Sequence, residues 1–209
     1  GASSGVFTGL APGTYTFKVT DANGCFATQS ITINNVTPIA IAGNKNNDAK
    51  CKGTSTGNGT FTISGIATPG NYSFTLTSAN LGTGSLTKSG NTLTLSNVLA
   101  GTYTVSVTDT ATGCTNSASI TIGEPALALD VTALATNINC NNDNATITAT
   151  AVGGTTNYKY AVVKQGASAP LPAVYVASNI LTVDTNSGAD MNWVVYVMDA
   201  NGCTDSVAV

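Results

Sequence analysis

Apolar and polar residues alternate along several short stretches of this chain. Within residues 102–109, Tyr103, Val105 and Val107 fall on one side and the intervening Thr and Ser residues fall on the other. A period of two is typical of a strand with one buried face. No stretch combines helical spacing with helix caps, so the pattern predicts an all-β protein. One run between two prolines predicts seven strands, at residues 38–43, 58–66, 71–78, 84–88, 92–97, 102–109 and 114–122.

The pattern is repeated along the chain. Residues 10–25 read LAPGTYTFKVTDANGC, residues 99–114 read LAGTYTVSVTDTATGC, and residues 193–203 read WVVYVMDANGC. The cysteines that close these stretches are 89 residues apart, and so are Cys51 and Cys140. This period fits one immunoglobulin-like sandwich and is too long for a solenoid turn. We therefore predict tandem immunoglobulin-like β-sandwich repeats of about 89 residues.

The repeat divides the chain into three parts. Strand-like Ile-Thr-Ile runs end shortly before Pro38 and Pro125, which mark the boundaries. Residues 1–37 are predicted to be the C-terminal part of a truncated repeat, residues 38–124 a complete repeat and residues 125–209 a nearly complete one. Linkers this short, with a proline in each, leave little freedom between modules. Each sandwich should add roughly 40 Å, so the modules should form a stiff rod.

The cysteine spacing suggests disulfides within repeats. Cys51 and Cys114 are 63 residues apart, as are Cys140 and Cys203. We predict the pairs Cys51–Cys114 and Cys140–Cys203, and a partner for Cys25 outside this stretch of sequence. Each bridge would stabilise its repeat by about 4 kcal/mol in the chain-entropy model. Such bonds persist in oxidising compartments, which places the chain outside the cytoplasm.

Composition narrows the function classes. Charged residues make up 8% of the chain, there is no His, and all seven basic residues are scattered Lys. A nucleic-acid partner would need a basic stripe with Arg, so that class is excluded. No run approaches the roughly 20 apolar residues of a spanning helix, so no membrane span is predicted. Without His to serve as a base or to join a metal site, we expect no enzyme, no catalytic residues and no metal centre.

Several residues have a structural or a ligand-binding interpretation. Tyr15 and Tyr103 follow Gly-Thr at the start of a strand and are predicted tyrosine corners, bonding backbone a few residues upstream. Trp193 is expected to be a core aromatic, with sugar stacking as the alternative. The Asp-Ala-Asn-Gly turns and the Asn-rich loops near Cys51 and Cys140 offer oxygen ligands for calcium. Calcium needs six to eight oxygens, so turn formation is favoured over a calcium site and no cofactor is expected.

Two of these stretches carry a family resemblance. Residues 10–15 with 19–25, and residues 99–114 followed by Ile-Thr-Ile-Gly-Glu-Pro at 120–125, resemble the SprB-type repeat of large surface adhesins of gliding Bacteroidetes. The third copy departs from it, with Trp193 in place of Tyr. The resemblance implies an Ig-like fold, export by the type IX secretion system and display on the cell surface. It also implies O-glycosylation at Asp-Ser/Thr followed by a small or aliphatic residue, which Thr110 and Ser206 match.

The sequence therefore favours one function over a second. The leading hypothesis is a structural stalk or filament of a large cell-surface adhesin involved in gliding motility and surface attachment. The alternative is a glycan- or protein-binding β-sandwich array on an exported protein. Expected partners are neighbouring repeats of the same chain, with surface polysaccharide or proteins of the motility and secretion machinery as further candidates.

Overall fold

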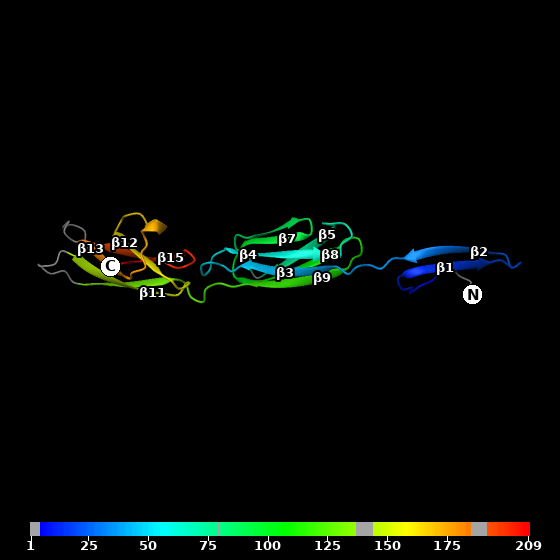
Figure 1. Cartoon of the computed structure of the whole chain (residues 1–209), viewed down its shortest axis with the longest axis horizontal. Helices are drawn as coiled ribbons and strands as arrows, with labels where there is room; N and C mark the ends of the chain where they lie inside the picture. The colour runs from blue at the N-terminus through cyan, green and yellow to red at the C-terminus, as the bar shows by residue number, and fades with distance from the viewer. Residues whose placement is uncertain (1–4, 79, 137–143, 185–191) are drawn as a thin grey trace.

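A computed structural model describes residues 5–78, 80–136, 144–184 and 192–209, and the strands it contains fall into three groups along the chain (Figure 1). The groups follow one another in a row, with the two larger ones adjacent. The first is a hairpin of β1 (Gly13–Thr20) and β2 (Phe26–Ile33). The other two are sandwiches. All strand pairs are antiparallel.

The middle sandwich contains seven strands in two sheets. Its strands are β3 (Ala40–Asn47), β4 (Gly57–Ser64), β5 (Tyr72–Ser78), β6 (Ser85–Ser89), β7 (Thr92–Val98), β8 (Gly101–Asp109) and β9 (Thr115–Ile122). One sheet has the order β3-β4-β7-β6 and the other β5-β8-β9. Lettered A to G in chain order, these are the ABED and CFG sheets of a constant-type immunoglobulin domain. The fold class predicted from the repeat is therefore the one observed.

The alternating residues explain this sandwich. Phe61, Leu93, Tyr103 and Val105 are almost fully buried, whereas the Thr and Ser residues between them face outward. Glycine is needed where Ile120 packs against β4, because a Cβ on Gly59 would collide with Cδ1 of Ile120. The middle sandwich thus has a complete core of its own.

The third sandwich repeats this plan with one strand fewer among its described residues. Its strands are β10 (Asp130–Ala135), β11 (Asn144–Val152), β12 (Lys159–Lys164), β13 (Ile180–Asp184), β14 (Trp193–Met198) and β15 (Thr204–Ala208). The sheets are β10-β11-β13 and β12-β14-β15, which correspond to A-B-E and C-F-G. Where the middle sandwich has β6, residues 165–179 contain the short 3-10 helix Pro172–Val174 and a bridge from Val176 to Tyr160. A separate core fills this sandwich.

The hairpin carries the F and G strands of the repeat, and among the described residues no second sheet faces it. Tyr15 and Val19 occupy the positions that Tyr103 and Val107 hold in the middle sandwich. Val107 is fully buried, whereas Val19 is 73% exposed. The same pattern therefore forms the same strand pair, but a second sheet is needed to bury its apolar face.

Candidate functional site

The most elaborate cluster of contacts lies at the joint between the two sandwiches. Four segments meet there: the β3–β4 loop at residues 48–56, the linker at 123–129, the β11–β12 turn at 153–156 and the β14–β15 turn at 199–203. We call residues 48–56 the cysteine loop and residues 199–203 the cysteine turn. The loop and the linker belong to the end of the middle sandwich where β9 finishes, and both turns belong to the facing end of the third sandwich (Figure 1).

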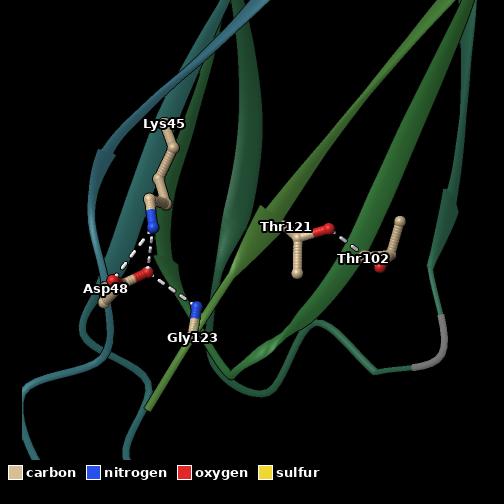
Figure 2. Close-up of polar contacts among 5 residues, drawn as sticks. All are labelled: Lys45, Asp48, Thr102, Thr121 and Gly123. Atoms are coloured by element: carbon tan, nitrogen blue, oxygen red, sulfur yellow. Dashed lines mark hydrogen bonds and ion pairs between the residues drawn. The ribbon is translucent and has the colours of Figure 1, made fainter.

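The linker is first held against the middle sandwich at Asp48. Its carboxylate accepts a hydrogen bond of 2.7 Å from the Gly123 N–H and forms an ion pair of 2.9 Å with Lys45 Nζ (Figure 2). The Ala49 N–H in turn donates to the Gly123 carbonyl at 2.9 Å. The hydrogen bonds from the Lys45 side chain and the Gly123 amide lower the pKa of Asp48. The carboxylate form of Asp48 is therefore the form that ties the linker to the loop.

Glu124 makes a second tie one residue further on. Its carboxylate accepts 2.7 Å from the Gly53 N–H and 3.1 Å from Lys52 Nζ. The Gly53 amide, followed by the Lys52 ammonium, lowers the pKa of Glu124. The Glu of the Ile-Thr-Ile-Gly-Glu-Pro stretch thus has a specific role, which is to hold the linker on the cysteine loop.

A disulfide then connects the two sandwiches. Cys51 in the cysteine loop is bonded to Cys203 in the cysteine turn, with 5.8 Å between their Cα atoms. Beside it, the Asn201 side-chain amide donates 3.1 Å to the Lys50 carbonyl and 2.9 Å to Thr155 Oγ1. The disulfide and the hydrogen bond from Asn201 to Lys50 therefore cross the joint side by side.

The cysteine turn is rigidly supported within its own sandwich. Asp199 is buried, and its Oδ1 accepts the N–H groups of Asn201 and Cys203 at 2.9 and 2.8 Å. Its Oδ2 accepts 2.9 Å from the Thr155 N–H, which fixes the neighbouring turn. Asp and Asn side chains commonly form such turns by bonding nearby backbone. The turn presents Cys203 and Asn201 toward the joint in one conformation.

The predicted disulfide between Cys51 and Cys114 is wrong. Cys51 is not bonded to Cys114, which is an exposed free thiol, as is Cys25. Cys114 lies directly before the first residue of β9. The cysteine loop packs at the other end of this strand, where Ala49 contacts Gly123, so the eight-residue strand separates the two cysteines by roughly 26 Å. A disulfide requires Cα atoms within about 7 Å. Cys203 is bonded to Cys51 and not to Cys140, which lies outside the described residues.

Sequence spacing could not distinguish the two pairings. The observed separation of 152 residues is the 63-residue spacing plus one 89-residue period, so both pairings recur equally well along the chain. The distinguishing signal was the strand count: an odd number of strands, β4 to β8, lies between Cys51 and Cys114, followed by the β8–β9 turn. Because consecutive strands of an immunoglobulin-like sandwich run in opposite directions, an odd count places the two cysteines at opposite ends.

The tyrosine corners have the predicted hydrogen bonds. The Tyr103 hydroxyl donates 2.7 Å to the Leu99 carbonyl, and it lies 3.0 Å from the Asn80 carbonyl. The Tyr15 hydroxyl donates 2.7 Å to the Ala11 carbonyl. Tyr103 is buried, and this burial raises its pKa. Both residues hold the start of their strand to the segment before it.

In the Asp-containing turns, the Asp carboxylates accept hydrogen bonds from backbone N–H groups of the same turn. Asp21 Oδ1 accepts the N–H groups of Asn23 and Cys25, both at 2.9 Å. In the Asn-rich loop before Cys51, Asn44 donates to Asn46, and Asp48 holds Lys45 and Gly123. The Asn-rich residues 141–143 lie outside the described residues. Among the described residues, no group of three or more His, Cys, Asp or Glu side chains is placed to hold a metal ion.

The remaining candidate residues lie at the surface or at the edge of a core. Thr110 is exposed, and its hydroxyl donates 2.7 Å to the Asn71 side-chain oxygen. Ser206 is exposed on β15, and Asp205 beside it accepts a bond from the Val131 N–H. Trp193 is half-buried against the core of the third sandwich, with Lys164 Nζ 5.9 Å from its ring centroid. Both hydroxyls are accessible to modification.

One face of the middle sandwich consists entirely of hydroxyl side chains. The outward positions of β5, β8 and β9 align in register and carry only Ser and Thr. Thr102 and Thr121 pair across the strands at 3.2 Å (Figure 2), and Thr104 and Ser119 pair at 2.8 Å. In the hairpin, Thr14 pairs with Thr32 in the same way. The full set is Ser73, Thr75, Thr77, Thr102, Thr104, Ser106, Thr108, Thr115, Ser117, Ser119 and Thr121.

The chain was compared with protein families, curated proteins and solved structures. No protein-family model and no curated protein matches the sequence. Among solved structures, a C-terminal 282-residue fragment of intimin, in complex with the intimin-binding domain of the translocated intimin receptor, aligns over 81% of this chain and 62% of its own. Its identity is 13% and its TM-score 0.32. Domains 4–9 of the surface layer protein SbsC align over 96% of this chain and 35% of their own, with 17% identity and a TM-score of 0.27.

The chain therefore spans less than two thirds of either structure, and neither TM-score reaches 0.5. The assignment of the immunoglobulin-like sandwich rests on the strand order described above. In the part of the chain that the structure describes, no helix is long and apolar enough to cross a membrane.

Proposed function

We propose that this chain is a stretch of structural stalk repeats from a large cell-surface adhesin that serves gliding motility and surface attachment. The observation that carries the proposal is the joint, where a disulfide and a hydrogen bond connect successive sandwiches and two carboxylates hold the linker on the middle one. A stalk must transmit force from its tip to its base without folding back on itself. A covalent bond beside the linker adds a second path for that force.

The disulfide also supports an extracellular location, because such bonds persist in oxidising compartments. The resemblance of residues 99–125 to SprB-type repeats supports the narrower assignment to gliding adhesins exported by the type IX system. In this proposal the partners are neighbouring repeats along the chain, and the chain itself carries no reaction and needs no cofactor.

The shape of the joint can be tested in solution. Small-angle scattering on residues 38–209 should give a maximum dimension of roughly 80 Å for two sandwiches in line, with little change in salt. Reduction of the disulfide should broaden the distance distribution. An oxidised protein whose two sandwiches move as freely jointed bodies would refute the stalk.

The cellular role needs a separate test. An antibody against residues 38–209 should label intact cells, and beads coated with it should be carried along the cell body. Labelling only after the cells are opened would refute surface display. Labelled beads that stay in place would refute the link to gliding while leaving the stalk intact.

A second candidate function has one specific observation in its favour. The flat, uncharged hydroxyl face of β5, β8 and β9 presents rows of donors and acceptors suited to a polysaccharide. Residues 38–124 should then bind a surface polysaccharide on a glycan array. Replacing the row Thr75, Ser106 and Ser117 with Ala should abolish binding, whereas Thr87→Ala on the opposite sheet should not. A spacer without this function would bind nothing in either form.

A further inference from the structure

The turn that carries Cys203 occurs a second time in the chain with the same sequence. Residues 21–25 and residues 199–203 both read Asp-Ala-Asn-Gly-Cys, the first between β1 and β2 and the second between β14 and β15. In both turns the Asp Oδ1 accepts the N–H groups of the Asn and the Cys at 2.8–2.9 Å. The Asp N–H donates to the Cys carbonyl at 2.9 Å in both, and the Gly N–H to the Asp carbonyl at 3.1 Å. The two turns are therefore the same structure.

What differs is the state of the sulfur. Cys203 is buried in a disulfide with Cys51, whereas Cys25 is an exposed free thiol. Because the turn has the same hydrogen bonds with and without the disulfide, its conformation does not depend on the bond. The turn is therefore preformed for the bond that Cys203 makes.

Cys114 occupies the equivalent place in the middle sandwich. Its turn is one residue longer, yet Asp109 is again buried and its Oδ1 again accepts a turn amide, that of Ala111, at 3.0 Å. The Asp109 N–H donates to the Cys114 carbonyl at 2.9 Å, and Thr112 bonds Asp109 Oδ2 at 2.7 Å. Cys114 is exposed just before β9, at the end of the sandwich that faces the β1–β2 hairpin (Figure 1).

We propose that Cys25 and Cys114 are attachment sites for the cysteine loop of a repeat that stands before them, bonded as Cys203 is bonded to Cys51. The partner has the chemistry of residues 48–56, a loop with a cysteine between two exposed lysines. Every joint of the array would then carry the same crosslink. The inference deepens the stalk proposal, but its test measures disulfide formation alone and does not depend on adhesion.

The chemistry of the step is thiol–disulfide exchange. The thiols of the loop and the turn each lose a proton, and their sulfurs together lose two electrons and form one S–S bond. A disulfide oxidant, such as glutathione disulfide, accepts the two electrons and the two protons and leaves as two thiols. Nothing else is consumed.

The test uses two copies of residues 38–124 in series, joined through residues 125–127. This linker keeps seven residues between Ile122 of the first copy and Ala40 of the second, as between Ile122 and Asp130 in the chain. Each copy has the closed core described above, and a cooperative melt with a β-type circular dichroism spectrum verifies folding. Residues 38–209, with the bond between Cys51 and Cys203, serve as the oxidised reference.

Each version retains only two cysteines, with the others replaced by Ser. With Cys51 in the first copy and Cys114 in the second, we expect more than about nine tenths of the protein to form the intramolecular bond in a glutathione buffer. Mass spectrometry after alkylation counts the thiols that remain. With both cysteines in one copy, or with Cys114 in the first and Cys51 in the second, we expect both to stay alkylatable, because they lie at opposite ends of a sandwich or of the pair.

The proposal is overturned if the facing pair stays reduced in buffer that oxidises residues 38–209, or if the same-copy pair forms the bond. A further version replaces residues 109–114 of the second copy with Asp-Ala-Asn-Gly-Cys. Bond formation only in that version would overturn the assignment for Cys114 and support it for Cys25, whose turn has that sequence.

Discussion

The chain contains two connections between consecutive modules, and they are held very differently. Between β9 and β10, the linker is bonded through Asp48 and Glu124, and the Cys51–Cys203 disulfide crosses the joint. Between β2 and β3, residues 34–38 are exposed and run in extended form from the hairpin to the middle sandwich (Figure 1). There the Asn116 side chain donates 3.0 Å to the Ile39 carbonyl. We call the connection between β2 and β3 the first joint and the connection between β9 and β10 the second joint.

The comparison shows that the middle sandwich contributes one half to each of two joints. Its F–G end supplies a cysteine turn to the joint before it, and its A–B end supplies a cysteine loop to the joint after it. At the second joint both halves are present. At the first joint the middle sandwich presents its turn with Cys114, while the hairpin consists of F and G strands only. The second joint therefore combines the loop of one repeat with the turn of the next.

The largest effect should come from breaking the second joint at its disulfide. Cys203→Ser should lower the free energy of unfolding by about 2–4 kcal/mol, because the crosslink constrains the unfolded chain. Cys51→Ser should cost the same, and the double variant should cost no more than either single one. Chemical denaturation of residues 38–209 without reductant measures all three.

The matched control is Cys114→Ser, which alters the equivalent exposed thiol and should change the free energy of unfolding by less than about 0.5 kcal/mol. An equal loss from Cys114→Ser would contradict the structure, in which Cys203 is in a disulfide and Cys114 is a free thiol.

The next effect compares the tyrosine corners at the two joints. Tyr103→Phe should cost about 1 kcal/mol, because it removes the donor of the part-buried hydrogen bond to the Leu99 carbonyl. Tyr15→Phe removes an exposed bond and should cost only a few tenths of a kcal/mol. Urea unfolding monitored by circular dichroism measures the loss in the sandwiches for Tyr103→Phe. Protease resistance of the hairpin measures the loss for Tyr15→Phe.

A smaller effect is expected where the linker sequences differ. Glu124 in the second joint corresponds to Asn35 in the first, one period earlier. Glu124→Ala should speed hydrogen exchange of the Gly53 amide, which loses its acceptor, and Glu124→Gln should have an intermediate effect. Asn35→Ala serves as the control and should leave exchange at Gly53 unchanged. An exchange rate that does not respond to Glu124→Ala would show that this contact does not hold the linker.

The smallest effect is a response to acid. The pKa of Glu124 and the pKa of Asp48 are both lowered in the folded protein, from ordinary values of 4.5 and 3.8. Their stabilisation is therefore complete above those values and is lost as pH falls through the lower folded values. Carboxyl NMR titrations should show both midpoints below the ordinary values, with the Gly53 and Gly123 amide signals shifting in the same range. A Glu124 midpoint at or above 4.5 would contradict the contact.

Much of the fold could be predicted from sequence because it depends on local patterns. The alternation around Tyr103 and Val105 predicted β8, and the seven predicted strands correspond to β3 to β9, although β3 begins at Ala40 and extends to Asn47. The Gly-Thr-Tyr stretches predicted the two corner hydrogen bonds. The 63-residue spacing suggested disulfides within repeats, whereas the observed disulfide connects two sandwiches.

The sequence by itself determined the repeat, the strands, the inward positions of each strand and the turns that hold the cysteines, since each depends on neighbours a few residues away. The tertiary structure decided which cysteine meets which. Spacing along the chain does not say at which end of a sandwich a residue lies, and β9 places Cys114 and Cys51 at opposite ends. It also decided burial, because Val19 and Val107 share a pattern and differ only in whether a second sheet packs against them.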